Sequence, residues 1–129
     1  MTLTYYQKKR LNLALCEERG ITTWKILNHE QPIWRLPGEQ TGIVKILDCL
    51  PDHLHPLEGL GHCAAARKEL LNTSGLQLSY ARNMHQAVNG RFITEVYPSD
   101  LYYLMNAGPE IQVQALLRTV GKMPEGISL

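Results

Sequence analysis

The sequence predicts a single α+β domain over residues 1–129, in which a small, mostly antiparallel sheet of four or five short strands is layered with about three amphipathic helices. Three observations lead to this prediction. Apolar residues recur at helical spacing in three segments, runs rich in β-branched and aromatic residues lie between them, and 129 residues suit one domain. A sheet face is a surface that could cover all three apolar stripes.

Composition excludes several classes of protein. Hydrophobic residues make up 44% of the chain and charged residues 19%, with a formal net charge of +1. This balance is typical of a globular protein, and it creates no broad field for nucleic acid or anionic lipid. No apolar run approaches the roughly 20 residues that cross a bilayer, so a membrane partner is not expected. The short run LNLALC is followed at once by Glu17, Glu18 and Arg19, which favours a helix over a signal peptide.

The first helix is predicted over residues 4–19. Thr4 and Gln7 form a capping-box pattern, in which each side chain satisfies an amide of the first turn. Leu11 and Leu15 share one face of this helix, and Gly20 is a suitable left-handed stop.

Strands are predicted next. ITTWKIL (21–27) is β-branched and aromatic, and PIWRL (32–36) follows it as a second strand with Pro32 at its start or on an edge. GIVKILDCL (42–50) fits a strand or a short helix, and its β-branched residues favour the strand. A second amphipathic helix is predicted over residues 57–72.

The segment that follows has two interpretations. Asn89-Gly90 lies between runs 76–88 and 91–97, and this dipeptide predicts a β-hairpin because a type I′ turn needs positive φ at both positions. The alternative is a helix over 79–88, since that run has few β-branched residues.

The last helix begins at Pro109, where proline loses no hydrogen bond, and Glu110 complements the positive end of the helix dipole. Its apolar stripe consists of Val113, Leu116, Leu117 and Val120. Gly121 ends the helix, and residues 122–129 are expected to form a flexible tail.

Potential metal ligands gather between residues 49 and 63: Cys49, His53, His55, His62 and Cys63. Their spacing matches no zinc motif, so we expect a polar loop without a metal or other cofactor. A site built from Cys49, His53, His55 and His62 stays open as an alternative. The three cysteines show no disulfide spacing and indicate a reducing cytoplasm, and no catalytic signature is present.

Aromatic residues supply the candidate binding positions. Trp24, Trp34 and Arg35 are predicted to bind a partner or a ligand, as are Tyr102 and Tyr103. A nucleotide-like molecule stacked on the tryptophans is the alternative occupant.

DNA binding is a further alternative. Residues 66–90 can be arranged as a helix-turn-helix, in which the base-reading side chains would be Arg82, Asn83, His85 and Gln86. The nearly neutral chain disfavours a nucleic-acid partner, because such proteins usually carry several basic residues for phosphates.

Two longer stretches resemble a known group. LNLALCEERGITTW (11–24) is similar to a helix of the type I-N-x-x-I-A-E-x-x-G-W, and it matches at Asn12, Glu17 and Gly20. AGPEIQVQALLRTVGKMPE (107–125) is similar to A-T-P-x-Q-R-A-E-A-F-L-R-T-x-G-K-W-E-E. With IWRLPGEQ and LEGLGHCAAARKELL between them, these stretches resemble small phage and prophage proteins of unknown function in the phage αβα sandwich domain group. The resemblance implies a phage or prophage origin and no catalytic residue.

These observations together predict a small cytoplasmic accessory protein that binds a host or phage protein, forms a homo-oligomer and performs no catalysis. The alternatives are a binder of a nucleotide-like ligand, such as a counter-defence sponge, and a DNA-binding regulator.

Overall fold

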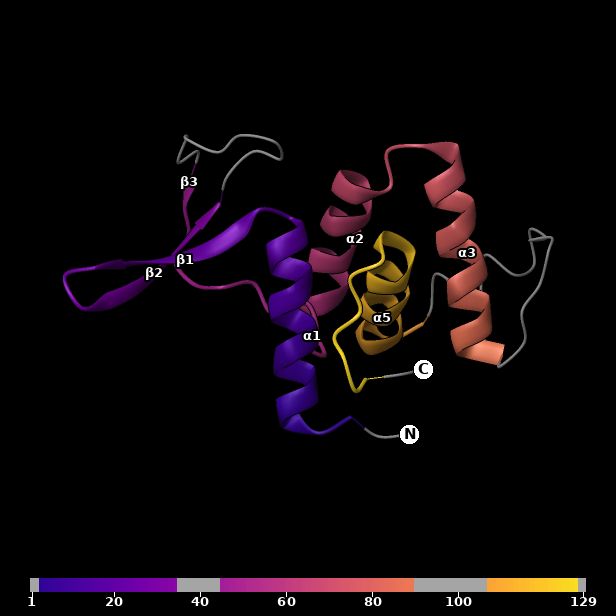
Figure 1. The fold of residues 1–129 in the computed structure, drawn as a ribbon, viewed down its shortest axis with the longest axis horizontal. Coiled ribbons are helices and arrows are strands. Elements are labelled where there is room, and N and C mark those ends of the chain that lie inside the picture. The colour runs from indigo at the N-terminus through magenta and orange to yellow at the C-terminus, as the bar shows by residue number, and fades with distance from the viewer. Residues whose placement is uncertain (1–2, 35–44, 90–106, 128–129) are drawn as a thin grey trace.

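The computed structural model describes residues 3–34, 45–89 and 107–127, and these form an α+β fold. The elements are α1 (Tyr5–Glu18), β1 (Ile21–Ile26), β2 (His29–Trp34), β3 (Lys45–Ile46), α2 (Gly59–Leu70), α3 (Ser74–Asn89) and α5 (Pro109–Val120). The helices pack into one body, and the hairpin of β1 and β2 projects from it beyond α1 (Figure 1). None of the helices in the described residues is long and apolar enough to cross a membrane.

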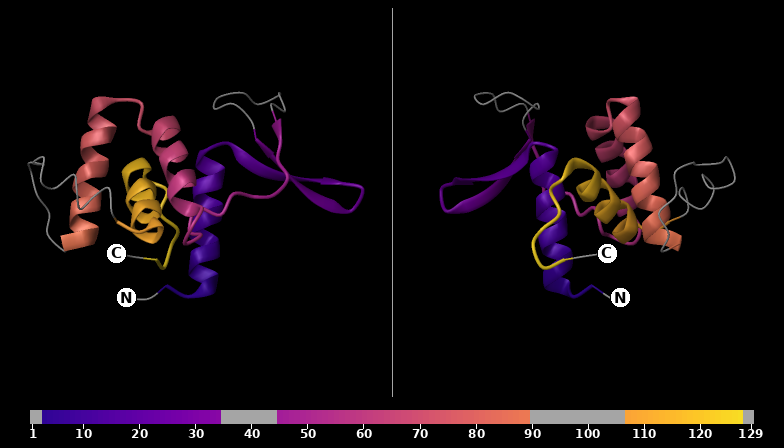
Figure 2. Two further views of the ribbon diagram at one scale, coloured as in Figure 1. Left: turned by 180° about the vertical axis from the view of Figure 1, so that it is seen from behind. Right: turned by 45° about the vertical axis from the view of Figure 1, so that its right-hand side comes forward.

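Helix α5 is the centre of the body. It contacts α1, α2 and α3, and Figure 2 shows it enclosed among them from two further directions. Every residue from 112 to 117 is buried. The main core cluster consists of Leu3, Leu11, Leu15, Leu54, Cys63, Ala66, Leu71, Val113, Leu116, Leu117 and Ile127.

The two core clusters are built from helices and connecting segments, and the strands add two buried side chains outside them, Ile21 at 3% and Ile33 at 1% exposure. The predicted layering of all three helices on one sheet is therefore not shown. The amphipathic stripes cover one another around α5, and α1 is the helix that contacts β1.

Helix termini follow their local signals. Thr4 and Gln7 form the predicted capping box at the start of α1. Pro109 opens α5, and Gly121 ends it with a φ of 73°. The amide of Lys122 donates to the Leu117 carbonyl at 2.9 Å, which completes the left-handed cap.

The sheet is antiparallel with the order β1-β2-β3. Leu27 and Asn28 connect β1 and β2 with φ values of 50° and 69°, as a type I′ turn requires. Strand β2 therefore begins at His29, three residues before the prediction. The ambiguous segment 42–50 contributes the two-residue strand β3. The described residues form three strands, so the predicted four or five are not shown.

The strand predicted over 76–88 is wrong, because this segment belongs to α3 and confirms the helical alternative. Tyr80, Met84 and Val88 recur every four residues. Met84 belongs to the second core cluster with Ala115 of α5, and Tyr80 and Val88 pack against that cluster. The other predicted half of the hairpin, 91–97, lies outside the described residues.

The segment after α5 packs on the helical body. Ile127 is only 6% exposed and belongs to the main core cluster. Arg10 of α1 donates from Nη2 to the Glu125 carbonyl at 2.8 Å. Residues 122–127, expected to belong to a flexible tail, thus contact the body through Ile127 and the Glu125 carbonyl.

Candidate functional site

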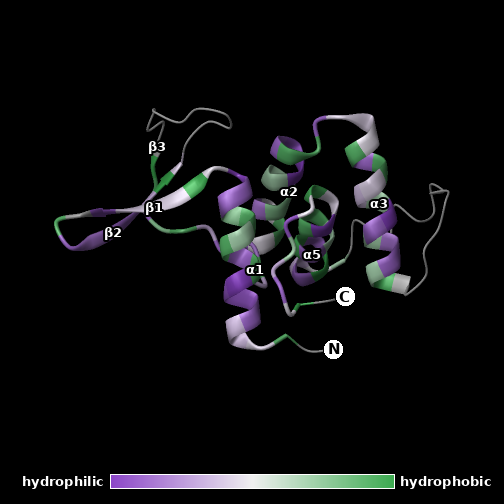
Figure 3. Cartoon of the chain, in the orientation of Figure 1, coloured by the Kyte–Doolittle hydropathy of each residue, from purple (hydrophilic) through white to green (hydrophobic). Residues whose placement is uncertain are grey.

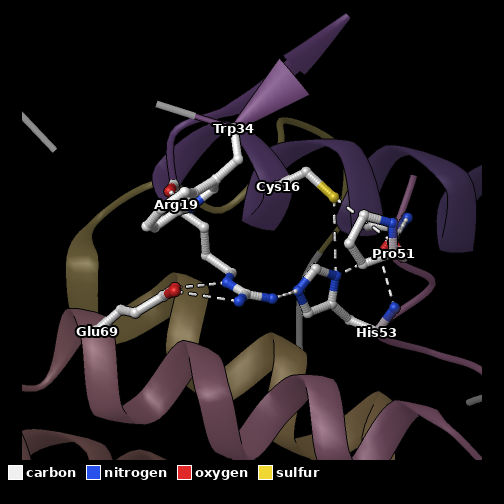
Figure 4. A network of polar contacts seen from close by, with 7 residues as sticks. Cys16, Arg19, Trp34, Pro51, His53 and Glu69 are labelled. Atoms are coloured by element: carbon white, nitrogen blue, oxygen red, sulfur yellow. Dashed lines mark hydrogen bonds and ion pairs between the residues drawn. The ribbon is translucent and has the colours of Figure 1, made fainter. Parts of the chain in front are cut away.

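A buried polar cluster surrounds His53, which lies in the segment leading to α2 (Figure 4). The imidazole is fully buried. Its Nδ1 lies 2.7 Å from Asn12 Oδ1, and its Nε2 lies 3.0 Å from Arg19 Nη1. Asn12 also accepts the His53 backbone amide at 2.8 Å and donates to the Pro51 carbonyl at 2.9 Å. Both ring nitrogens are thus engaged by residues of α1 and its C-cap.

These partners fix the tautomer of His53. A guanidinium can only donate, so Nε2 must carry the lone pair that accepts from Arg19. Asn12 Oδ1 can only accept, so Nδ1 carries the proton. The imidazole is therefore neutral, and no free lone pair is left on it to act as a base.

The environment opposes protonation of this histidine. Burial lowers the pKa of His53 to about 3, with further lowering by the charge of Arg19 and by His62. The His53 and His62 rings lie 5.8 Å apart between centroids. A proton on Nε2 would point at a cation and would have no acceptor there.

Arg19 joins three elements through one residue. Its guanidinium forms a bidentate pair with Glu69 of α2, at 2.6 and 3.1 Å. Its carbonyl accepts from the Trp34 indole at 3.0 Å, which ties the base of β2 to the end of α1. Arg19 is only 8% exposed, and a buried charge is costly unless it is paired. Here the Glu69 carboxylate neutralises it and His53 accepts a further hydrogen bond.

Neither buried cysteine of the cluster is a thiolate at neutral pH. Burial raises the pKa of Cys16 to about 12 and that of Cys63 to about 11. Cys16 Sγ lies 3.8 Å from His53 Nδ1, which already holds a proton, and 3.6 Å from the Pro51 carbonyl. A thiol without a base beside it is a poor nucleophile. The cluster is better described as a set of buried hydrogen bonds that joins α1 to α2 than as a catalytic site.

The predicted metal ligands do not converge. Across 3–34, 45–89 and 107–127, no three His, Cys, Asp or Glu side chains are placed to hold a metal ion. Cys49 is exposed. His55 Nδ1 instead accepts the amides of Leu57 and Glu58, each at 3.1 Å. His62 contacts the His53 ring, whose nitrogens are occupied.

The two tryptophans lie on opposite faces of the hairpin. Ile21 pairs with Trp34 in the ladder, and Trp24 stands three residues along from Ile21, which reverses its face. They cannot stack the same nucleotide base. Trp34 is anchored at the base of the arm, whereas Trp24 is 48% exposed. Arg35, Tyr102 and Tyr103 lie outside the described residues.

Exposed apolar side chains mark the projecting arm. Leu27 at its tip is 89% exposed, in a backbone conformation that leucine rarely adopts. Figure 3 shows the apolar colour at this turn, beside hydrophilic stretches of β1 and β2.

The proposed base-reading residues lie on α3, which follows α2 after three connecting residues. The two helices thus occur in helix-turn-helix order. Asn83, however, donates from Nδ2 to Thr119 of α5 at 3.0 Å, which directs it into the body. Arg82, His85 and Gln86 are all half-buried.

An open groove of about 440 Å³ runs along α1 beside the segment 50–56. Its lining is Tyr5, Lys8, Lys9, Asn12, Leu13, Leu50, Asp52, Leu54, Pro56 and Glu110. Lys8 and Glu110 form an ion pair at 2.8 Å across it. Both signs of charge line the groove, so it selects no class of charged ligand.

The sequence analysis missed Arg19 and Glu69, and it gave no structural role to Asn12. Arg19 and Glu69 are fifty positions apart, so no local spacing connects them. One signal was present, because Asn12 is one of the residues on which the expected resemblance to phage proteins rests. Comparison of the chain with protein families, curated proteins and solved structures finds no match.

Proposed function

We propose that this chain is a non-catalytic protein-binding module and that the hairpin of β1 and β2 is its binding arm. The observation that carries the proposal is the exposure of Trp24 and Leu27 on a two-stranded arm that projects from the helical body. Aromatic and large apolar side chains on a protruding element are typical of contact surfaces between proteins.

The chemistry of the arm supports this role. A two-stranded ribbon is marginally stable in water by itself. A turn suited only to solvent would carry Asn-Gly, yet this one places leucine at a positive φ. Leu27 is exposed and its positive φ costs conformational energy. Contact with a partner protein, which would bury this side chain, would account for a leucine at this position.

The buried cluster supports the non-catalytic part of the proposal. His53 has no free lone pair, and the raised pKa values of Cys16 and Cys63 keep both as thiols. His53, Cys16 and Cys63 lie instead in a buried cluster whose hydrogen bonds join α1 to the segment that leads into α2.

The biological setting that we propose is a phage or prophage accessory protein in the host cytoplasm, which binds a host or phage protein. The similarity of residues 11–24 and 107–125 to phage proteins supports the origin. All three cysteines are free, which suits a reducing compartment.

Affinity capture from lysate of the source cells tests the binding arm. The double variant Trp24→Ser/Leu27→Ser should lose the proteins that the unmodified chain retains. The matched control is Tyr5→Ser/Leu57→Ser, because those residues are 82% and 85% exposed but lie off the arm. If the arm variant retains the same proteins as the control, the arm is not the binding surface.

DNA binding is the second candidate, and the helix-turn-helix order of α2 and α3 favours it. A mobility shift at low salt that disappears in Arg82→Ala would support this function. The absence of any shift at low salt would end it.

A further inference from the structure

Strand β1 has one edge that no described residue pairs. In a two-residue hairpin the residues that flank the turn, Ile26 and His29, exchange backbone hydrogen bonds, and such pairs alternate along the ladder. Thr22 and Trp24 therefore bond β2, whereas the backbone N–H and C=O of Thr23 and Lys25 point away from it.

The opposite edge of the hairpin, on β2, is paired from Pro32 to Trp34. The Leu47 amide donates to the Pro32 carbonyl at 2.9 Å, but proline has no N–H to return to Leu47. The side-chain amide of Gln31 donates to the Leu47 carbonyl instead. Pro32 thus ends the ladder on the β3 side, and among the described residues β1 has the longest unpaired edge.

We infer that the open edge of β1 pairs antiparallel with β1 of a second copy of this chain, which joins two hairpins into one continuous sheet across a two-fold axis. The inference rests on the proposed function, because it names the partner of the same arm. Edge pairing of this kind uses main-chain hydrogen bonds for affinity and alternate side chains for register.

Charge and side-chain size select one register. Pairing Lys25 with Lys25 of the second copy would oppose like charges directly. Shifting the strands by one residue pair places Trp24 opposite Trp24 of the second copy and Lys25 opposite Thr23. In this register Thr23 and Lys25 exchange their outward hydrogen bonds, and the exposed tryptophans meet in the closer, non-hydrogen-bonded position.

A further shift in the same direction would carry Leu27 of the second copy past Ile21, toward the end of α1. The register centred on Trp24 avoids this approach. The resulting interface is one strand pair with its aromatic side chains, which is small compared with a standard interface. The dimer is accordingly weak, and the fraction of chains in the dimer rises with protein concentration.

Sedimentation equilibrium of the full chain, from low micromolar to millimolar concentration, is the first test. The wild type should dimerise. Thr23→Pro should raise the dimer dissociation constant about tenfold or more, because it removes an outward N–H and leaves the hairpin's own ladder bonds in place. Thr23→Ala is the matched control, since it removes the side chain but keeps the amide, and it should dimerise as the wild type does.

A disulfide trap is the second test and does not depend on proline. In a Cys49→Ser background, Trp24→Cys should form a covalent dimer under mild oxidation that reductant reverses, because opposite strand positions lie within disulfide range. Thr22→Cys, on the same face, should remain monomeric, since the two copies of residue 22 are far apart in this register.

Either a chain that stays monomeric throughout the concentration range or a dimer insensitive to Thr23→Pro overturns the inference, as does equal trapping at positions 22 and 24. A monomer whose capture of other proteins still depends on Trp24 and Leu27 would overturn self-pairing and leave the proposed function intact.

Discussion

Asn12 holds the segment 51–53 against α1 with both ends of its side-chain amide. Its oxygen accepts two N–H groups of His53, and its nitrogen donates to Pro51. Because these groups lie between packed elements, removing one side chain leaves several polar atoms without partners. The stability of this region therefore depends on a few particular residues.

Asn12→Ala should lower the free energy of unfolding by about 3 kcal/mol, because it leaves the two His53 N–H groups and the Pro51 carbonyl without their hydrogen-bond partner. Lys9→Ala, at an exposed position of the same helix, should change it by less than about 0.5 kcal/mol. Urea denaturation measures both values. Similar small effects for the two variants would contradict the conclusion that the hydrogen bonds of Asn12 stabilise the contact between α1 and the segment 51–53.

His53 makes stability depend on pH. The folded pKa of about 3 lies below the unfolded value of 6.5, so the unfolded chain binds the proton more readily between these values. The stabilisation is complete above pH 6.5 and is lost as pH falls toward 3. The free energy of unfolding should drop by about 2 kcal/mol between pH 6.5 and pH 5.

Denaturation curves over this pH interval provide the measurement. His53→Gln should flatten the dependence, whatever its effect on absolute stability. An equal slope in the wild type and in His53→Gln would show that another group is responsible.

At the scale of the elements, α2 approaches the His53 segment at a glycine. A Cβ added to Gly59 would meet the His53 carbonyl oxygen at 2.5 Å and the Pro109 side chain at 3.1 Å. Gly61, in the same helix, has open space around it. Only one of these glycines is required by packing.

Gly59→Ala should therefore destabilise the fold by about 1–3 kcal/mol through overpacking. Gly61→Ala should stabilise it by up to about 1 kcal/mol, because alanine favours the helix. Thermal unfolding of the two variants gives the comparison, and a Gly59→Ala variant as stable as Gly61→Ala would refute the close approach of α2.

The β1–β2 turn gives a second prediction at this scale. Leu27→Gly should raise hairpin stability by up to about 1 kcal/mol at low protein concentration, because glycine adopts a positive φ without steric cost. The same change should weaken capture of protein partners. Unchanged stability together with unchanged capture would show that Leu27 neither strains the turn nor contributes to partner binding.

Elements marked by their ends were predictable from the sequence. Thr4, Gln7, Pro109 and Gly121 gave the limits of α1 and α5 because caps are local chemistry. The segment 76–88 was assigned wrongly because the Asn-Gly signal outweighed the helical spacing of Tyr80, Met84 and Val88, which was also visible.

The buried cluster was beyond prediction for a physical reason. His53 is partnered by residues 41 and 34 positions away, so only the packed fold brings them together. Trp24 and Trp34 were correctly singled out as aromatic residues of strands, but their opposite faces follow from the turn at Leu27. One residue more or less in that turn would change which partners they meet.

At the scale of the whole molecule, the helical body contains the core clusters and the projecting arm carries exposed apolar side chains. The two core clusters of the body form around α5, and Ile21 and Ile33 are the buried strand residues at the base of the arm. The arm is joined to it at Arg19 and Trp34, and can therefore be altered beyond its base without opening the core. This division is what permits the arm to serve as a contact surface.

Amide hydrogen exchange, resolved by residue with NMR at several protein concentrations, tests the central claim that the open edge of β1 pairs with β1 of a second copy. The amides of Thr22 and Trp24 should be protected at every concentration, since they bond β2. The amides of Thr23 and Lys25 should exchange rapidly in dilute protein and become protected as concentration rises. Rapid exchange of Thr23 and Lys25 at all concentrations, or protection of all four amides in dilute protein, would contradict the claim.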